Sequence, residues 1–181
     1  MSSFSTQAVS SSNVPLPLEE SATSAAGLAQ RLNKMEDRIA VIDALYRFAA
    51  GQDMKDTALF ASAFAEEAEL DFVQPAARLG VTLAPFKGRD AIVSSIMAAV
   101  GQLDTSHTVT NPRVEISGDR AGLHALVEAQ HVPKDDHERH LLLKNFYEAE
   151  LKRNGDLWRI TSLRITNIWM DGDGSVLFPG R

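Results

Sequence analysis

The stretch AGLHALVEAQHVPKDDHERHLLLKNFYEAEL at residues 121–151 decides how the chain folds. Small or apolar residues alternate with other residues along its first third, and the alternation resumes after the polar run PKDDHE at 133–138. A period of two is typical of a strand with one buried face. The polar run between the two alternating parts predicts a connection. The stretch therefore predicts two neighbouring antiparallel strands.

The same alternation extends to both sides of this pair. Strand-like segments lie near 105–117, 120–132, 139–153 and 156–169. The connections carry Gly118-Asp119 and Asn154-Gly155, and an Asn-Gly step between apolar runs is a strong hairpin signal. These segments together predict an antiparallel meander of long strands.

Upstream of Gly101 the period becomes helical. Apolar residues within 28–51 recur at steps of three and four and so share one face of a predicted helix; they are Met35, Ile39, Ile42, Tyr46 and Ala49. Gly51 is the expected end of that helix. A second, shorter helix is expected from Asp53 and a third after residues 87–90, with a short strand at 66–72 and a loop at 74–85 between them.

Helices followed by a run of strands indicate an α+β domain, with three N-terminal helices packed on a mostly antiparallel sheet. We place this domain at 28–170. Residues 1–27 are rich in Ser, Ala and Thr without an apolar period, so we expect a disordered or loosely ordered arm. The tail 171–181 has the composition of a turn, and its apolar end is a candidate pocket lid.

Composition excludes several classes of function. The chain has 181 residues, 44% of them hydrophobic and 23% charged, which suits one globular domain. A net charge of −6 without a basic stripe argues against a nucleic-acid partner. The absence of cysteine excludes disulfides, thiolate metal sites and a cysteine nucleophile. No apolar run approaches the ~20 residues of a membrane span, and no targeting segment is evident, so we expect a cytoplasmic protein with no membrane partner.

Strand parity singles out polar residues on apolar faces. One face of the 120–132 segment is small and apolar until it ends at His131. The corresponding face of the 139–153 segment is interrupted by Asn145 and Tyr147. A buried polar group without a partner costs about 1–3 kcal/mol, so either the fold or a ligand must satisfy these groups.

His107 fits this pattern only with an irregularity in its strand. Simple alternation places it on the same face as Arg113 and Glu115, which is the wetter one. A bulge near Asn111-Pro112 would reverse the parity and turn His107 inward, and proline within a strand often marks a bulge. We therefore expect a bulge at this point.

These residues resemble the NTF2-like superfamily of cone-shaped, cystatin-like folds, in its SnoaL-like branch. Within that branch the chain is similar to the scytalone dehydratases and the hexachlorocyclohexane dehydrochlorinases. The motifs that carry the resemblance are YRFAAGQDMKD at 46–56, Ser106-His107, His131 and GDLWRI at 155–160. The resemblance covers about residues 35–169 and implies a curved sheet around a cavity.

The resemblance also implies a mechanism. In the family the aspartate that matches Asp53 orients the histidine that matches His107, which acts as a base. In the scytalone dehydratases a histidine that matches His131 takes part in the acid–base work, and we expect His131 to protonate or polarise the departing oxygen. The implied activity is a cofactor-independent lyase of the dehydratase type, or an isomerase, acting on a small hydrophobic, polyketide- or aromatic-like substrate. No metal or cofactor is implied, and the expected assembly is a homo-oligomer, a dimer or trimer.

The residues expected to contact substrate depart from the dehydratase pattern. They are Asn145, Tyr147, Gln52, Tyr46, Phe72 and Trp169. Gln52 and Phe72 stand where the dehydratases carry tyrosines, and Asn145 and Tyr147 replace a serine and an asparagine. The base is retained while the groups that face the substrate are altered.

Structural interpretations remain open beside this one. Asp53 precedes a predicted helix and, with Asp56 three residues on, could be its N-cap. His131 could be a core histidine bonded to a backbone carbonyl, and His107 an exposed strand residue. The whole domain could be a non-catalytic binding or assembly module, similar to the small subunit of ring-hydroxylating oxygenases, since this fold serves many purposes.

Overall fold

The computed structural model describes residues 24–179. The chain divides into two units, Met1–Glu36 and Asp37–Arg181. Most of the predicted arm lies outside the described residues. Its last residues already belong to helix α2 (Ala25–Asp53), which begins three residues before the predicted domain start at 28.

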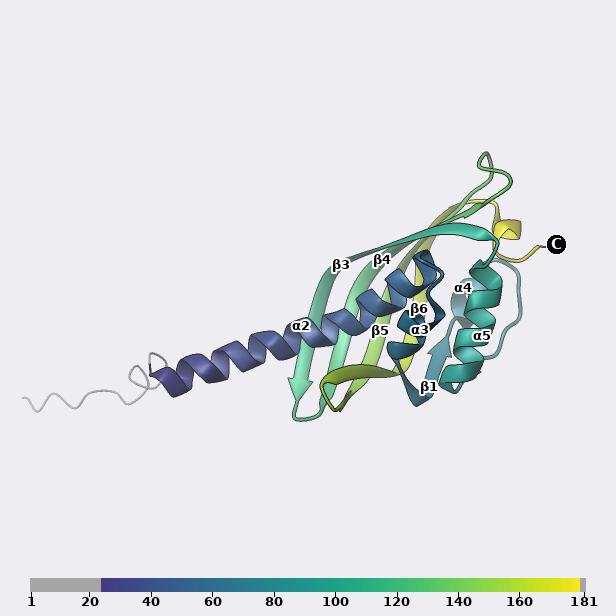
Figure 1. The fold of residues 1–181 in the computed structure, drawn as a ribbon. Coiled ribbons are helices and arrows are strands. Elements are labelled where there is room, and N and C mark those ends of the chain that lie inside the picture. Colours follow the sequence, from purple (N-terminus) through teal and green to yellow (C-terminus); the bar gives the residue numbers. More distant parts are fainter. Residues whose placement is uncertain (1–23, 180–181) are drawn as a thin grey trace, which may run out of the picture. The chain divides into compact units, whose positions relative to one another are not determined.

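The second unit contains the remaining elements (Figure 1). After α2 they are α3 (Thr57–Ser62), β1 (Phe64–Asp71), α4 (Val73–Arg78), β2 (Phe86–Lys87), α5 (Arg89–Val100), β3 (Leu103–Ser117), β4 (Arg120–Pro133), β5 (Leu141–Asn154), β6 (Leu157–Gly172) and the 3-10 turn η1 (Gly174–Val176). The short α4 replaces part of the loop predicted at 74–85. The helices-then-strands order of an α+β domain is confirmed.

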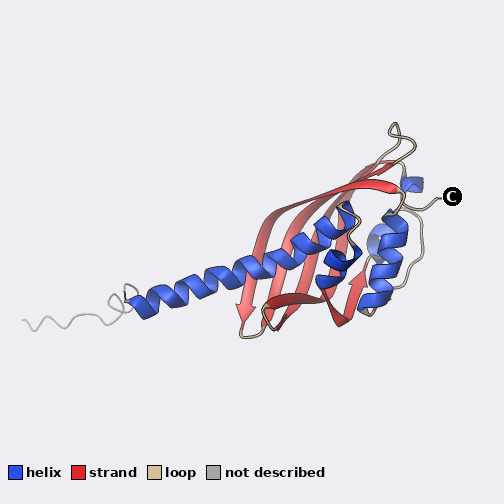
Figure 2. Ribbon diagram, viewed as in Figure 1, coloured by secondary structure: helices blue, strands red, loops and turns tan. Residues whose placement is uncertain are grey.

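The strands form one sheet in the order β2-β1-β6-β5-β4-β3. The predicted meander of β3 to β6 is antiparallel throughout, and β1 joins β6 in parallel. Figure 2 shows the long strands curving around α3 and α5. Side chains that alternate towards these helices build the core, so the sequence parity identified the buried face.

The core is centred on aromatic rings at the junction of α2, α3 and β1. Phe48, Phe60 and Phe64 pack with ring centroids 5.3–5.9 Å apart, and Phe48 also meets Tyr147 of β5 at 5.7 Å. Tilted and edge-on pairs of this kind stabilise by about 0.5–1.5 kcal/mol beyond their buried area. They fix the end of α2 against the sheet.

The buried face of α2 differs from the predicted one. Ala49 is buried and Ile42 packs against the core, as predicted, but the other inward residues are Val41, Ala44, Leu45, Phe48 and Gln52. Ile39 and Tyr46 are 65% and 49% exposed, although they belong to an apolar series of helical spacing. The helix carries two such series. The series that ends at Phe48 is the buried one, because Phe48 packs in the aromatic core.

Gly51 does not end α2, which continues to Asp53. A Cβ atom at Gly51 would lie 2.5 Å from the backbone nitrogen of Phe60, so this position lets α2 and α3 approach closely. The N-cap of α3 is Asp56, whose Oδ1 accepts from Leu59 N at 2.9 Å. The N-cap interpretation of Asp53 is therefore wrong.

A buried arginine fastens the second half of α2 to the sheet. The Arg47 guanidinium donates to the backbone carbonyls of Ser62 and Trp158, the latter at 2.7 Å, and its Nε pairs with Asp43 at 2.7 Å. These contacts join α2, the end of α3 and the start of β6. The last turn of α2, which carries Gln52 and Asp53, is consequently held in place.

The bulge predicted in β3 is confirmed. The register with β4 shifts between Thr110 and Arg113, and Asn111 adopts a φ of 53°. Before the bulge Val109 packs against the core, and after it Val114 does so. The parity reversal turns His107 inward, and its side chain is only 3% exposed.

Candidate active site

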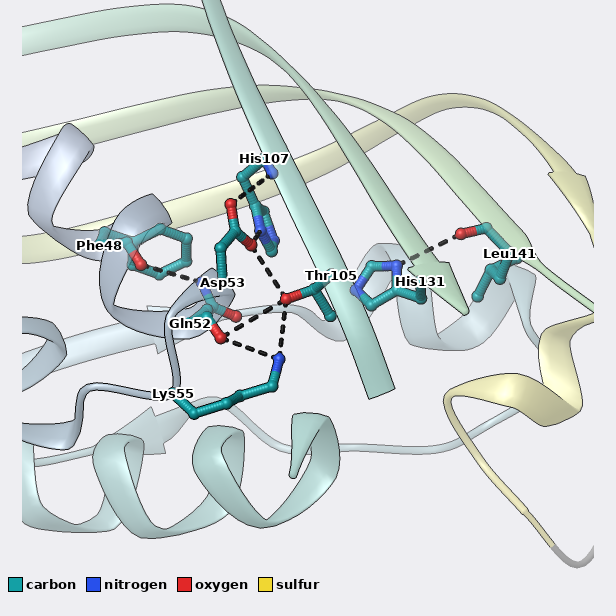
Figure 3. A network of polar contacts seen from close by, with 8 residues as sticks. All are labelled: Phe48, Gln52, Asp53, Lys55, Thr105, His107, His131 and Leu141. Carbon is teal, nitrogen blue, oxygen red and sulfur yellow. Dashed lines mark hydrogen bonds and ion pairs between the residues drawn. The ribbon is translucent and has the colours of Figure 1, made fainter. Parts of the chain in front are cut away.

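Asp53 and His107 form a close pair at the last residue of α2 and the middle of β3 (Figure 3). His107 Nδ1 lies 2.6 Å from Asp53 Oδ1, and the His107 backbone N–H donates to Asp53 Oδ2 at 2.8 Å. The carboxylate thus holds both the ring and the main chain of the histidine. Because a carboxylate accepts, Nδ1 carries the proton and Nε2 is left with its lone pair.

Two further residues complete this polar network. Thr105 Oγ1 donates to Asp53 Oδ1 at 2.9 Å, and Lys55 Nζ donates to Thr105 Oγ1 at 3.0 Å and to Gln52 O at 2.9 Å. Lys55 has a φ of 58°, a conformation that non-glycine residues seldom adopt. The turn after α2 therefore places its ammonium group beside the dyad at some conformational cost.

The network keeps Asp53 ionised. Burial raises the pKa of this carboxyl, but the hydrogen bonds from His107 and Thr105 and the nearby imidazole outweigh that effect and leave the pKa below its ordinary value. An acid at the C-terminal end of a helix also opposes the helix dipole. The interaction of the Asp53 carboxylate with the helix dipole is thus unfavourable, and its hydrogen bonds with β3 offset that cost.

We expect Thr105→Val to reduce the free energy of unfolding by about 1.5 kcal/mol at neutral pH, because a charged acceptor loses one hydrogen bond at nearly constant side-chain volume. The lowered pKa of Asp53 means that this contribution is present above its unfolded value of 3.8 and is lost as the pH falls through the lower folded value. Urea denaturation near pH 7 and in acid checks both points. Thr105→Ser keeps the hydroxyl and serves as control; equal losses in both variants would contradict the prediction.

His131 lies beside the dyad, on β4. Its ring is 5.8 Å from that of His107, centroid to centroid, and its Nδ1 lies 3.3 Å from the backbone oxygen of Leu141. A carbonyl only accepts, so Nδ1 carries the proton here too. Burial, together with the nearby His107, lowers the pKa of His131 to about 4. His131 is therefore neutral near pH 7, with Nε2 as an acceptor.

This burial makes stability depend on pH. The folded pKa of about 4 lies below the ordinary 6.5, so the unfolded chain binds more protons between these values and stability falls as the pH drops through this range. Between pH 7 and pH 5 the wild type should lose about 2 kcal/mol of its free energy of unfolding, and His131→Phe should not lose this amount. Denaturant unfolding of both proteins measures the difference. His124→Ala, an exposed change on the same strand, serves as control. Parallel pH curves for wild type and His131→Phe would contradict the assignment.

A cavity of about 180 Å³ opens beside the two histidines. A dry cavity of ~150 Å³ accommodates benzene, so this one suits a single substituted ring. Its wall is mainly aromatic and aliphatic. The polar residues that line it are Gln52, Ser95, His107, His131, Asn145 and Tyr147.

The structure brings together most of the predicted site residues. Gln52 and Phe72 line the cavity with Asn145 and Tyr147, as do Leu177 and Phe178 of the tail that was predicted to cover it.

Tyr46 and Trp169 lie outside the cavity, contrary to prediction. Tyr46 is two positions from Phe48, about 200° around the helix, and faces outwards. Trp169 is paired with Lys144 on the outer face of the sheet and is 44% exposed. Neither side chain is placed to contact a ligand beside His107.

Sequence reasoning missed Lys55, Ser95 and Asn167. Asn167 pairs with Asn145 across β5 and β6 and is 4% exposed. It follows Leu163 and Ile165 on the inward face of β6, so the parity argument that found Asn145 would have found it. Lys55 and Ser95 carry no such signal. Lys55 is positioned by the turn after α2, and Ser95 by the face that α5 turns to the cavity. Among the described residues no group of three metal-ligating side chains occurs, and no helix has the length and hydropathy of a membrane span.

A family model described as a SnoaL-like domain matches residues 33–164. The chain belongs to the SnoaL-like domain family. A curated relative of this SnoaL-like domain is terrestric acid biosynthesis cluster protein E of Penicillium crustosum, which is 34% identical over 152 residues, 78% of this chain and 90% of the relative.

Solved structures share the fold of this SnoaL-like domain. A candidate scytalone dehydratase from Novosphingobium aromaticivorans has a TM-score of 0.66 at 19% identity, with 78% of this chain and 90% of that one covered. The type 3 hexachlorocyclohexane dehydrochlorinase of Novosphingobium barchaimii has a TM-score of 0.64 at 20% identity, with 83% and 99% covered. The architecture is thus the NTF2-like, cystatin-like fold that the sequence resembled.

Proposed function

We propose that the protein is a cofactor-independent lyase or isomerase that removes a proton from a carbon of a small hydrophobic substrate. The observation that carries this proposal is the Asp53–His107 pair, 2.6 Å apart, with His107 on the wall of an apolar cavity. A histidine with a fixed tautomer and a buried anionic partner is suited to general base catalysis.

The relatives support this class of reaction. One is named for a biosynthesis cluster, and two proteins of the same fold are named for the elimination of water or of hydrogen chloride. A biosynthetic elimination or isomerisation therefore agrees with the family and with the site.

The base in this proposal is Nε2 of His107. It takes the proton as the carbon–hydrogen bond breaks, and the electron pair forms the new double bond. The resulting imidazolium keeps its Nδ1–H on the Asp53 carboxylate, which stabilises the positive charge. Few water molecules can screen this interaction, because the His107 side chain is 3% exposed.

The proton then leaves through the same imidazole. His131 is neutral and its Nδ1–H is directed at Leu141, so its free nitrogen accepts hydrogen bonds and lacks a proton to give. This disfavours the expected role of His131 as proton donor. In an elimination the His107 imidazolium protonates the departing hydroxyl as the carbon–oxygen bond breaks, and water is released. In an isomerisation the same proton returns to another carbon.

A non-catalytic assembly module is the alternative, and it would need no hollow interior. The cavity of about 180 Å³ beside His107 is the feature that favours an enzyme. Its size also limits the substrate to roughly one substituted ring.

Incubation in D₂O with a panel of hydroxy-ketone and polyketide-like compounds tests the proposal. Mass spectrometry detects carbon-bound deuterium, which reports proton abstraction, and loss of water, which reports elimination. Deuterium uptake without water loss, together with a product of the same mass class in which the double bond has moved, identifies an isomerase. A cavity that binds panel members without either change would reject catalysis in favour of binding.

A further inference from the structure

Two buried amides, Asn145 on β5 and Asn167 on β6, stand opposite each other in the sheet. They are 0% and 4% exposed, and Asn167 Nδ2 donates to Asn145 Oδ1 at 2.8 Å. Asn145 also lines the cavity. The two amides therefore form a hydrogen-bonded pair that extends from the interior of the sheet to the wall of the cavity.

The surroundings of Asn167 fix which way both amides face. Asn167 Nδ2 lies 2.8 Å from Trp169 O and 3.2 Å from Lys144 O. Carbonyl oxygens only accept, so the opposite orientation of this amide would place oxygen against two oxygens. With Asn167 fixed as a donor, Asn145 must present its oxygen to Asn167 and its nitrogen to the other side.

That nitrogen has no partner within the described chain. Asn145 Nδ2 is buried and reaches no acceptor at hydrogen-bonding geometry, although the Asn145 amide lies near enough to the Tyr147 hydroxyl to act on its pKa. Its neighbour on the strand, Tyr147, also lines the cavity. Burial raises the pKa of Tyr147 and the Asn145 amide offsets this only in part, so the tyrosine keeps its proton. Two neutral donors thus meet on one wall, and one of them lacks an acceptor. A buried donor left unpaired is costly, and a ligand acceptor removes that cost.

We propose that the cavity recognises a carbonyl oxygen through the Nδ2–H of Asn145, assisted by the Tyr147 hydroxyl, and that Asn167 is the positioning residue that fixes this polarity. The inference rests on the proposed function for its chemical meaning: when His107 removes a proton from the adjacent carbon, negative charge collects on that oxygen. Preorganised donors at such an oxygen stabilise the enolate and so lower the barrier. The substrate class is accordingly a carbonyl compound with an acidic neighbouring carbon.

Acetophenone and ethylbenzene provide a matched pair of probes, because they differ in the carbonyl oxygen and fit a cavity of this size. We expect calorimetry or ligand-observed NMR to show about tenfold tighter binding of acetophenone to the wild type. Asn145→Leu, similar in shape, should abolish this preference. Asn167→Leu, which frees the Asn145 amide to rotate, should reduce it to about threefold.

The carbonyl stretching frequency of bound, ¹³C-labelled acetophenone gives a second readout. It should fall on binding to the wild type and return towards its value in an apolar solvent in Asn145→Leu. Because both probes are compared within one protein, a general folding defect weakens both and leaves their ratio informative.

Binding separates this inference from the proposed function. If the wild type fails to bind acetophenone, or binds both probes equally, the carbonyl assignment is overturned. Deuterium exchange on other substrates still tests His107 as the base in that case. His124→Ala should retain the tenfold preference, because His124 is exposed and does not line the cavity. An Asn167→Leu variant with the full preference would overturn the positioning role.

Discussion

His107→Ala lowers the rate of deuterium uptake by an identified substrate about 10²–10⁴-fold, the usual contribution of a general base. The cavity retains its apolar wall, so substrate binding changes far less than turnover, and the loss appears in kcat. Asp53→Asn should cause a similar loss by a different route. An amide accepts through one oxygen only, whereas Asp53 accepts from both N–H groups of His107 through two.

His124→Ala is the matched control for the base. His124 is also a strand histidine, but it is exposed and its ring packs on Phe146 at 5.0 Å, away from the cavity. Its replacement should leave turnover unchanged. Full activity in His107→Ala would refute the proposed role of the dyad, and loss of activity in all three variants would indicate a general effect on folding.

Gly51→Ala destabilises the fold by about 2 kcal/mol, although alanine is the better helix former by about 1 kcal/mol. The added Cβ would meet the backbone N, Cα and Cβ atoms of Phe60 at 2.5–2.6 Å. These are backbone and near-backbone atoms, so α3 has to move as a unit. Urea denaturation measures the change through the midpoint at constant m-value.

Gly122→Ala separates this clash from the general effect of replacing glycine. Gly122 lies in β4, and a Cβ atom added there would meet nothing within 4 Å, so its replacement should be neutral or slightly stabilising. Stability of Gly51→Ala equal to the wild type would show that α2 and α3 can separate freely. Because Asp53 follows Gly51 by two residues, we also expect a weakened dyad in Gly51→Ala.

The sheet could be predicted because its information is local. Each long strand carries its own alternation, and the reversal in β3 is marked by Asn111-Pro112. His131 could be placed on the inward face from this parity alone, and His107 once a bulge at Asn111-Pro112 was assumed. The existence of the first helix was equally clear from its period.

The orientation of that helix could not be predicted, because two apolar series run along it. Only the aromatic core, built from α3, β1 and β5, selects Phe48 over Tyr46. The same holds for Asp53 and Asp56: both suit an N-cap by residue type, and a strand about fifty residues away decides that Asp53 binds His107 while Asp56 caps. Lys55 and Ser95 likewise acquire their places from tertiary packing.

The backbone hydrogen bond from His107 to Asp53 has a consequence beyond chemistry. β3 is an edge strand of the sheet, and exposed strands of this kind invite pairing with other chains. At His107 that amide is already engaged by the carboxylate. The acid that orients the imidazole therefore also occupies one outward amide of this edge, and its loss would leave that amide free to pair with another strand.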